Sequence, residues 1–104
     1  MKKILEKRGK ASLVGEFEDD KLFRAYILKG KKRVPKPALE VDYRRRSGKV
    51  TLDGDWLVFE KGVAREKYDN YIWGDPSEGK KKMSFEAWLP YALEQMKGYL
   101  NFYK

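Results

Sequence analysis

The stretch GKVTLDGDWLVFEKG, residues 48–62, constrains the fold more than any other part of the chain. Asp-Gly at 53–54 predicts a two-residue hairpin turn, because a type I′ turn needs positive φ at both central positions. The turn pairs Leu52 with Asp55, Thr51 with Trp56, Val50 with Leu57 and Lys49 with Val58. Since side chains alternate between faces, Val50, Leu52, Leu57 and Phe59 form an apolar face. The opposite face carries Lys49, Thr51, Trp56, Val58 and Glu60, so the largest aromatic side chain falls where water is expected.

Residues 11–18 and 22–29 predict a second hairpin around Asp19, Asp20 and Lys21. A three-residue loop with a bulge places Leu13, Gly15, Phe17, Phe23, Ala25 and Ile27 on one face. A two-residue loop instead sets Glu16 opposite Phe23 and mixes the faces. Because register follows the cleaner apolar face, we expect the first arrangement. It pairs Glu16 with Arg24 and Val14 with Tyr26 on the outer face.

Residues 30–38, GKKRVPKPA, predict a basic loop. Pro35 and Pro37 cannot sit in a central strand, so a rigid linker or a flap between strands is expected. The next segment, LEVDYRRR, predicts a strand. Its apolar face carries Leu39, Val41 and Tyr43, and its opposite face carries Arg44 and Arg46.

The remaining polar segments give weaker signals. Residues 1–10 are a basic start, either a short strand or a frayed arm. Residues 62–67 suit a helical turn, and residues 68–73 suit a fifth strand. Residues 74–83 are expected to be a loop because of their Gly and Pro content.

From Ser84 onward, apolar residues recur at helical spacing. They are Phe85, Trp88, Leu89, Ala92, Leu93, Met96, Tyr99 and Leu100. Ser84 is a suitable N-cap. Pro90 is tolerated only near a helix start, which allows the regular part to begin there. The pattern predicts a helix over about residues 84–101.

Together these elements predict one α+β domain over residues 1–104. It is a four- or five-stranded antiparallel sheet, over about residues 11–73, with one C-terminal amphipathic helix packed on one face. One helix covers only part of such a face, so a homodimer is expected to complete the cover. No run approaches 18 apolar residues and the N-terminus has no apolar h-region, so we expect no membrane span, no signal peptide and a cytoplasmic location.

The chain has no Cys and no His. Disulfides and thiolate metal sites are therefore excluded, and the usual general base is missing. No paired-carboxylate site, acidic metal cluster, phosphate-binding loop or nucleophile elbow is recognisable. We therefore expect no enzyme, no metal site and no cofactor. One Gln and two Asn beside abundant Lys and Glu are typical of hyperthermophiles, although a small basic protein from a mesophile can look similar.

The net charge of +8 is unevenly distributed. Residues 1–50 carry a net charge of +9, and residues 29–49 alone carry +7. Such a focused field suits a polyanionic partner, either nucleic acid or an anionic surface. Solubility at high temperature is the alternative, but it predicts interspersed charges, which fits the C-terminal half better.

The outer face of the predicted sheet combines cations with aromatic rings. It carries Arg24, Tyr26, Arg44, Arg46, Lys49, Thr51 and Trp56. Lysine and arginine neutralise phosphates, and flat rings stack exposed bases at roughly 1–3 kcal/mol per base. Tyr26 and Trp56 are therefore expected to stack bases. The alternative is that Trp56 packs against the chain's N-terminal segment or a dimer partner.

The basic loop is a second candidate surface. Lys29, Lys31, Lys32, Arg33 and Lys36 are expected to close over a nucleic-acid strand as a flap. A solvated loop is the alternative. The lysines of EGKKKMSFEAW, residues 78–88, precede a helix start that can bind anions, but a solvated loop is favoured there.

The ending IWGDPSEGKKKMSFEAWLPYALEQM resembles the single-stranded-DNA-binding module of the positive-cofactor-four type of transcriptional coactivator. Gly79, Lys80, Lys81, Ser84 and Trp88 match that family's basic turn, serine and helix tryptophan. The resemblance implies four strands followed by one helix, dimerisation through the helices and nucleic acid on the sheets. The arrangement is also similar to the ThermoDBP type of single-stranded-DNA-binding domain.

The sequence therefore predicts binding of single-stranded nucleic acid with low sequence specificity, with DNA favoured over RNA. The alternative is a small regulatory or protein–protein module that docks on an acidic partner, with Trp56 and Tyr26 as its anchors. A third possibility, coating of duplex DNA, would not depend on the aromatic residues.

Overall fold

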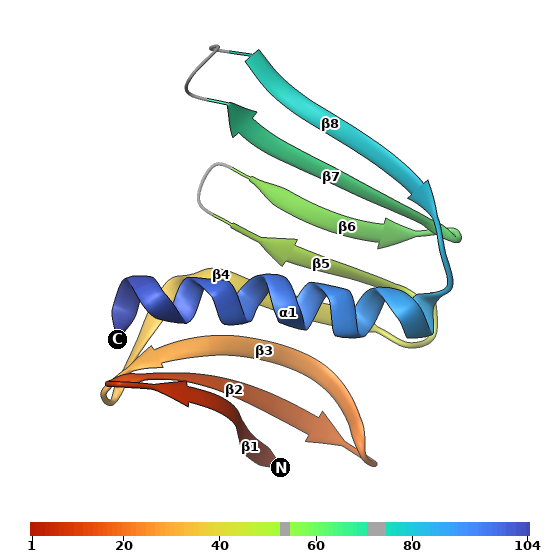
Figure 1. The fold of residues 1–104 in the computed structure, drawn as a ribbon. Coiled ribbons are helices and arrows are strands. Elements are labelled where there is room, and N and C mark those ends of the chain that lie inside the picture. The colour runs from red at the N-terminus through yellow and green to blue at the C-terminus, as the bar shows by residue number, and fades with distance from the viewer. Residues whose placement is uncertain (53–54, 71–74) are drawn as a thin grey trace.

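The computed structural model describes residues 1–52, 55–70 and 75–104, with the backbone alone for residues 68–70 and 75–79. The chain forms two layers, an antiparallel sheet and one helix along one face of it (Figure 1). The strands are β1 (Lys2–Arg8), β2 (Ala11–Glu18), β3 (Lys21–Lys29), β4 (Lys32–Asp42), β5 (Ser47–Thr51), β6 (Trp56–Glu60), β7 (Val63–Asn70) and β8 (Asp75–Lys82), and the helix is α1 (Phe85–Tyr103). The molecule measures 37 × 35 × 17 Å. Within the described ranges, no helix has the apolar length needed to cross a bilayer.

The strands lie in the sheet in chain order, and each pairs antiparallel with the next. The α+β class and the C-terminal helix on the sheet are confirmed. The sheet has eight strands, however, so the expectation of four or five is wrong. The additional strands are β1, β7 and β8, whose charged sequences KKILEKR, VAREKYDN and DPSEGKKK lack a clean apolar alternation. In Figure 1, β7 and β8 lie beside the part of the sheet that the helix covers. Because the helix packs mainly on β1, β2, β4, β5 and β6, they do not need a strongly apolar face.

The strands β7 and β8 correct the expectations of a helical turn at 62–67 and of a loop at 74–83. Residues 62–67 form no helical turn, because Lys61 and Gly62 make a tight turn with φ of 53° and 76°. Val63 then pairs with Glu60 and begins β7. Likewise, the predicted loop at 74–83 contains β8. Of the predicted fifth strand at 68–73, residues 68–70 belong to β7 and residues 71–73 lie outside the described ranges.

Pro35 and Pro37 lie inside β4, a central strand, so the expected loop at 30–38 is wrong. The register explains how β4 accepts them. Tyr26 of β3 pairs with Ala38 and Leu28 pairs with Arg33, so residues 34–37 oppose a single residue of β3. Pairing of β4 with β5 likewise reaches only as far as Ala38. The prolines therefore occupy a bulge outside the ladder, where their missing N–H groups break no inter-strand hydrogen bond.

The hairpin of β2 and β3 combines the two loop arrangements considered above. Asp19 and Asp20 alone form the turn, with φ of 51° and 63°. A bulge at Glu16/Phe17 then shifts the register, so that Glu16 faces Arg24 and Val14 faces Tyr26 as predicted. The observed hairpin differs from the expected one in the residue that enters the core. Leu22 is buried there, whereas Phe23 was expected.

The hairpin of β5 and β6 has the predicted register. Val50 pairs with Leu57 and Thr51 pairs with Trp56. The N–H of Leu52 donates to the carbonyl oxygen of Asp55 at 2.9 Å, while the turn residues 53–54 lie outside the described ranges. The predicted apolar face is confirmed, because Val50, Leu52, Leu57 and Phe59 are at most 2% exposed.

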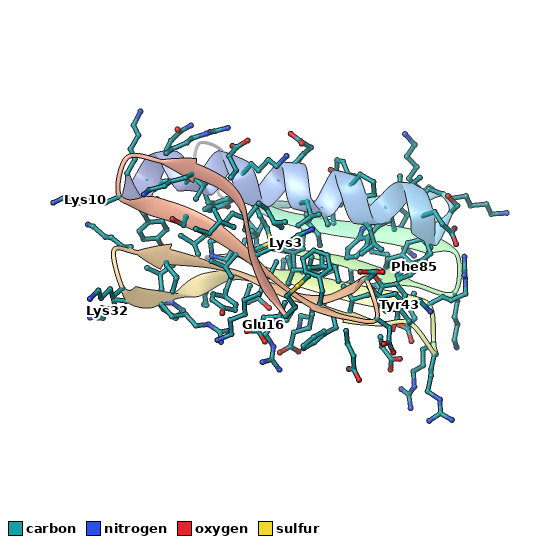
Figure 2. All side chains as sticks on the ribbon, turned by 90° about the horizontal axis from the view of Figure 1, so that it is seen from below. Lys3, Lys10, Glu16, Lys32, Tyr43 and Phe85 are labelled. Atoms are coloured by element: carbon teal, nitrogen blue, oxygen red, sulfur yellow. The ribbon has the colours of Figure 1, made fainter. Side chains whose placement is uncertain are left out.

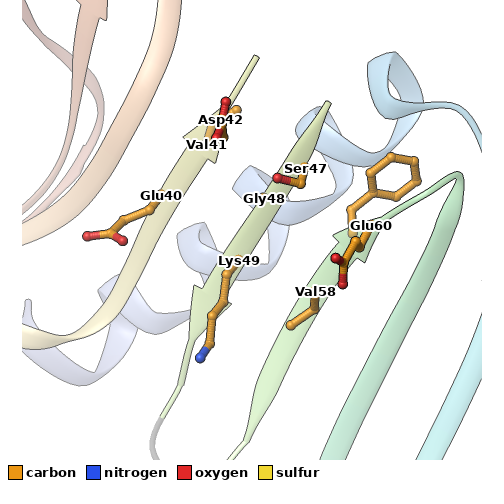
Figure 3. Close-up of a pocket in the computed structure, with 9 residues that line it drawn as sticks. Glu40, Val41, Asp42, Ser47, Gly48, Lys49, Val58 and Glu60 are labelled. Atoms are coloured by element: carbon orange, nitrogen blue, oxygen red, sulfur yellow. The ribbon is translucent and has the colours of Figure 1, made fainter. Parts of the chain in front are cut away.

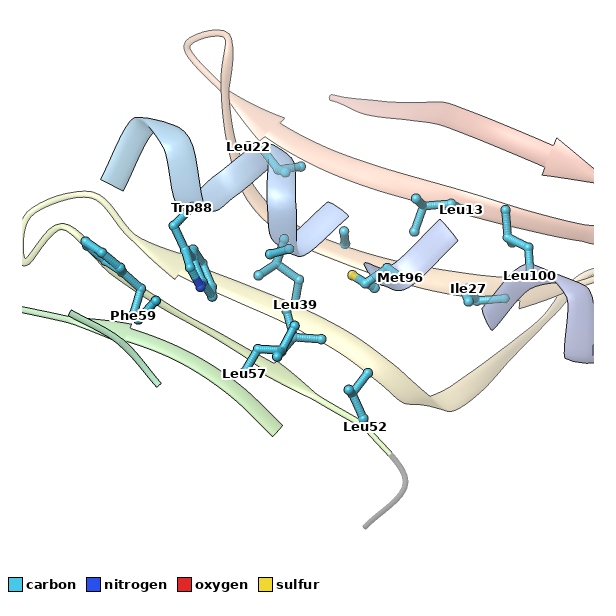
Figure 4. Packing of buried hydrophobic residues seen from close by; sticks show 14 of the residues in the cluster. Leu13, Leu22, Ile27, Leu39, Leu52, Leu57, Phe59, Trp88, Met96 and Leu100 are labelled. Atoms are coloured by element: carbon cyan, nitrogen blue, oxygen red, sulfur yellow. The ribbon is translucent and has the colours of Figure 1, made fainter. Parts of the chain in front are cut away.

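The core lies between α1 and the apolar side of the sheet, to which β2, β3 and β4 contribute residues such as Leu13, Ile27 and Leu39 (Figure 4). The helix buries Phe85, Trp88, Ala92, Met96 and Leu100. It packs against β1, β2, β4, β5 and β6. The predicted helical periodicity is confirmed, and the helix begins at Phe85 with Pro90 on its exposed side in the second turn.

Ser84 caps this helix, because its Oγ accepts a hydrogen bond from the N–H of Ala87 at 3.1 Å. We expect Ser84→Ala to lower the free energy of unfolding by about 1 kcal/mol, since an N-terminal amide then loses its partner. Ser84→Asp keeps an acceptor and should restore most of the loss. Chemical denaturation followed by circular dichroism measures both. An equal loss in the two variants would contradict the capping role.

Candidate nucleic-acid interface

The face of the sheet opposite α1, called the open face below, is ordered by the register into rows that cross all eight strands. The first row consists of Lys2, Glu16, Arg24, Glu40, Lys49, Val58, Arg65 and Lys80. The second row consists of Ile4, Val14, Tyr26, Ala38, Thr51, Trp56, Lys67 and Glu78. Figure 2 shows Glu16 of the first row on the side of the sheet away from the helix. Both rows therefore lie on the face opposite the helix, although Val14 and Tyr26 of the second row are only 5% exposed.

Trp56 lies on the open face, as predicted. It pairs with Thr51 on β5 and with Lys67 on β7, and its side chain is half-buried. The guanidinium of Arg65 lies 5.6 Å from the centre of the indole. The N-terminal segment does not cover Trp56, because β1 forms the far edge of the sheet. An aromatic ring and a cation thus lie side by side on this part of the sheet.

Tyr26 also lies on the open face, but its ring is only 5% exposed. The guanidinium of Arg33 covers it at 4.2 Å from the ring centre. Arg33 itself is exposed. In this arrangement the planar guanidinium, rather than the tyrosine ring, is the exposed surface.

Arg24 occupies its predicted place beside Tyr26. Its guanidinium lies 3.6 Å from a carboxylate oxygen of Glu16. Glu40 is its other cross-strand neighbour. Arg24 therefore has a carboxylate on both sides in the row, which partly neutralises it.

The lysines of the predicted flap do not form a loop over the open face. Lys29, Lys31 and Lys32 are exposed around the β3–β4 turn, at one end of the sheet. The N–H of Gly30 in this turn donates to the carbonyl oxygen of Lys10 at 2.8 Å, and Figure 2 shows Lys10 and Lys32 at the same end. This lysine end is a basic edge of the molecule.

Lys36 lies apart from this lysine end, in the proline bulge of β4. Its side chain is exposed, and its carbonyl oxygen accepts a hydrogen bond from the hydroxyl of Tyr103 at 3.0 Å.

The predicted positions of Arg44 and Arg46 are wrong. The strand ends at Asp42, whose carboxylate accepts hydrogen bonds from the N–H groups of Arg44 and Arg45, and the chain turns there. Arg46 has a φ of 49° and forms an ion pair with Glu86 of α1. The hydrogen bond from Arg46 lowers the pKa of the Glu86 carboxyl. Arg46 thus contacts the helix rather than the open face.

Lys49 lies beside a shallow depression of about 340 Å³ on β4, β5 and β6 (Figure 3). Its lining includes the carboxylates of Glu40, Asp42 and Glu60 as well as the Lys49 ammonium. The depression therefore has mixed charge. No group of three or more potential metal ligands occurs among the described residues.

Sequence reasoning did not place Arg65, Lys67 and Lys80 on the open face, and it considered Lys80 only as a lysine that precedes the helix. They were missed because residues 62–67 and 74–83 were not expected to form strands. The available signals were the Lys-Gly pair at 61–62, whose glycine suits a tight turn, and the alternation of VAREK, with Val63, Arg65 and Lys67 on one face.

Comparisons of the chain with models of known protein families, with curated proteins and with solved structures found no match. The resemblance to the two groups of single-stranded-DNA-binding domains therefore stays a prediction.

Proposed function

We propose that the open face binds single-stranded nucleic acid with little sequence preference. The observation that carries this proposal is the contact between the Arg65 guanidinium and the Trp56 ring on the sheet face opposite α1. A partly exposed indole can stack a base, because every base has a flat π-face. The neighbouring cations can neutralise phosphates, whatever the sequence of the strand.

Single strands should be preferred to duplexes on this face. Bases within a duplex are already stacked on one another, so they cannot reach the ring of Trp56. Among the residues that the structure describes, the open face also presents neither a helix nor a projecting ribbon that could enter a major groove. A duplex would therefore use the cations alone.

The test is a titration of a fluorescently labelled single-stranded oligonucleotide, followed by anisotropy at several salt concentrations. A matched duplex of the same sequence serves as the control. We expect tighter binding of the single strand, and log K should fall linearly with log salt by about 0.7 for each phosphate neutralised. Equal affinity for the duplex would contradict base stacking. Absence of binding at low salt would overturn the proposal and favour a protein partner.

A further inference from the structure

The two halves of the open face differ in the charge pattern of the first row. On β1 to β4 the row alternates in sign, with Lys2, Glu16, Arg24 and Glu40 in succession. Each cation in this half has at least one carboxylate beside it, and Arg24 approaches Glu16 within 3.6 Å. Opposite charges directly across a pair of strands attract each other, so this half offers little net attraction to phosphate.

On β5 to β8 the same row reads Lys49, Val58, Arg65 and Lys80. It contains three cations and no carboxylate, and the side chains of Lys49, Arg65 and Lys80 are all exposed. Glu40 is the one acidic neighbour in the row, and it lies between Arg24 and Lys49. The row thus carries a net charge of zero on β1 to β4 and +3 on β5 to β8.

The second row shows the same contrast in its aromatic residues. Tyr26, on β3, is 5% exposed beneath Arg33, and its neighbours Val14 and Ala38 are apolar. Trp56, on β6, is half-buried and lies one row from the three cations. The ring that a base can reach therefore occurs in the same half as Arg65 and Lys80, the two cations of the row that have no carboxylate directly across from them.

From these differences we infer that a nucleic-acid strand contacts the β5–β8 half, on a patch of Lys49, Trp56, Arg65 and Lys80. This inference rests on the proposed function and narrows it to four residues. Adjacent strands are about 4.8 Å apart, so the three cations span about 14 Å across the sheet. With one ring in this patch, each molecule stacks one base and binds a short segment. The nucleic acid crosses the β-strands rather than running along them.

The experiment compares two double variants in the anisotropy titration with single-stranded oligonucleotide. Arg65→Ala/Lys80→Ala removes two cations of the patch. Lys2→Ala/Arg24→Ala removes two cations of the same row in the other half. Both variants lower the net charge by two, so long-range attraction falls by the same amount in each. A difference between them therefore reports local contacts.

We expect Arg65→Ala/Lys80→Ala to reduce the slope of log K against log salt by about 1.4, since each lost single-strand phosphate contact removes about 0.7. The control should keep the slope of the unmodified chain. Thermal unfolding followed by circular dichroism checks that both variants fold.

Each other outcome overturns the inference in a distinguishable way. If the slope of log K against log salt changed equally in the two variants, the nucleic acid would contact the whole open face rather than the β5–β8 half. If the slope stayed unchanged in both variants while the unmodified chain still bound, the contact would lie at the lysine end. Nucleic-acid binding itself would then still hold. Failure of the unmodified chain to bind would overturn the proposed function and the patch together.

Discussion

Trp88→Ala is expected to lower the free energy of unfolding by about 3–5 kcal/mol, the range typical of a buried aromatic side chain. Trp88 is 0% exposed, and its ring centre lies 5.8 Å from that of Phe59. It joins the helix to the hairpin of β5 and β6, so its removal leaves a cavity at the centre of the core. Denaturation in guanidinium, followed by far-ultraviolet circular dichroism, measures the loss.

Gly48 provides the matched test of this packing. A Cβ atom at Gly48 would lie 2.4 Å from the ζ3 carbon of Trp88, too close for two carbon atoms. Gly48→Ala should therefore destabilise the chain by about 1–3 kcal/mol through overpacking. The cost should shrink in a Trp88→Phe background, where the smaller ring leaves room for the methyl group. A cost that is the same in both backgrounds would contradict the contact between Gly48 and Trp88.

Trp56→Ala is expected to weaken single-stranded oligonucleotide binding by about 5- to 150-fold, the equivalent of the roughly 1–3 kcal/mol lost with one stacked base. Because Trp56 is half-buried on the face opposite the helix, its truncation leaves the core intact. The salt dependence should keep its slope, since no cation is removed. Anisotropy titrations of the two proteins at matched salt concentrations measure the effect.

Trp56→Phe is the control for this prediction, because it retains an aromatic face and should recover much of the affinity. Trp88→Phe changes an aromatic residue on the other side of the sheet and should leave binding unchanged. Equal affinity of Trp56→Ala and the unmodified chain would contradict stacking on this ring. In that case the remaining attraction would come from the cations alone.

The central hairpin and the helix were predictable because each must bury one face. The alternation of Val50, Leu52, Leu57 and Phe59 admits a single register once the turn is placed, since a slip by one residue would expose the set. The recurrence of Phe85, Trp88, Ala92 and Met96 likewise admits one helix face. The structure buries all of these residues.

The edge strands β1 and β8, and β7 next to β8, were not predictable by the same reasoning. β1, β7 and β8 lie at the margins of the sheet and carry charged residues on both faces, so their sequences resemble loops. The prolines of β4 led to the wrong prediction of a loop at 30–38 for a related reason. A bulge frees residues 34–37 from pairing, and a bulge depends on the partner strand rather than on the local sequence.

The candidate site was predictable where the strands were. The register placed Tyr26, Lys49 and Trp56 on the open face, but the covering of Tyr26 by Arg33 depends on a contact that no periodicity encodes. Arg46 was misplaced because the chain turns at Asp42, and its contact with Glu86 joins residues that are far apart in the sequence. Arg65 was missed together with β7, and Lys80 was considered only as a lysine before the helix because β8 was expected to be a loop.

Tryptophan fluorescence during titration with a short single-stranded oligonucleotide tests the stacking of a base on Trp56 most directly. The chain has three tryptophans, and the difference between the unmodified chain and Trp56→Phe isolates the signal of Trp56. Quenching of that difference signal on binding, with the same midpoint as the anisotropy titration, is the expected result. Binding that depends steeply on salt while the Trp56 signal stays constant would contradict stacking and leave only the basic surface.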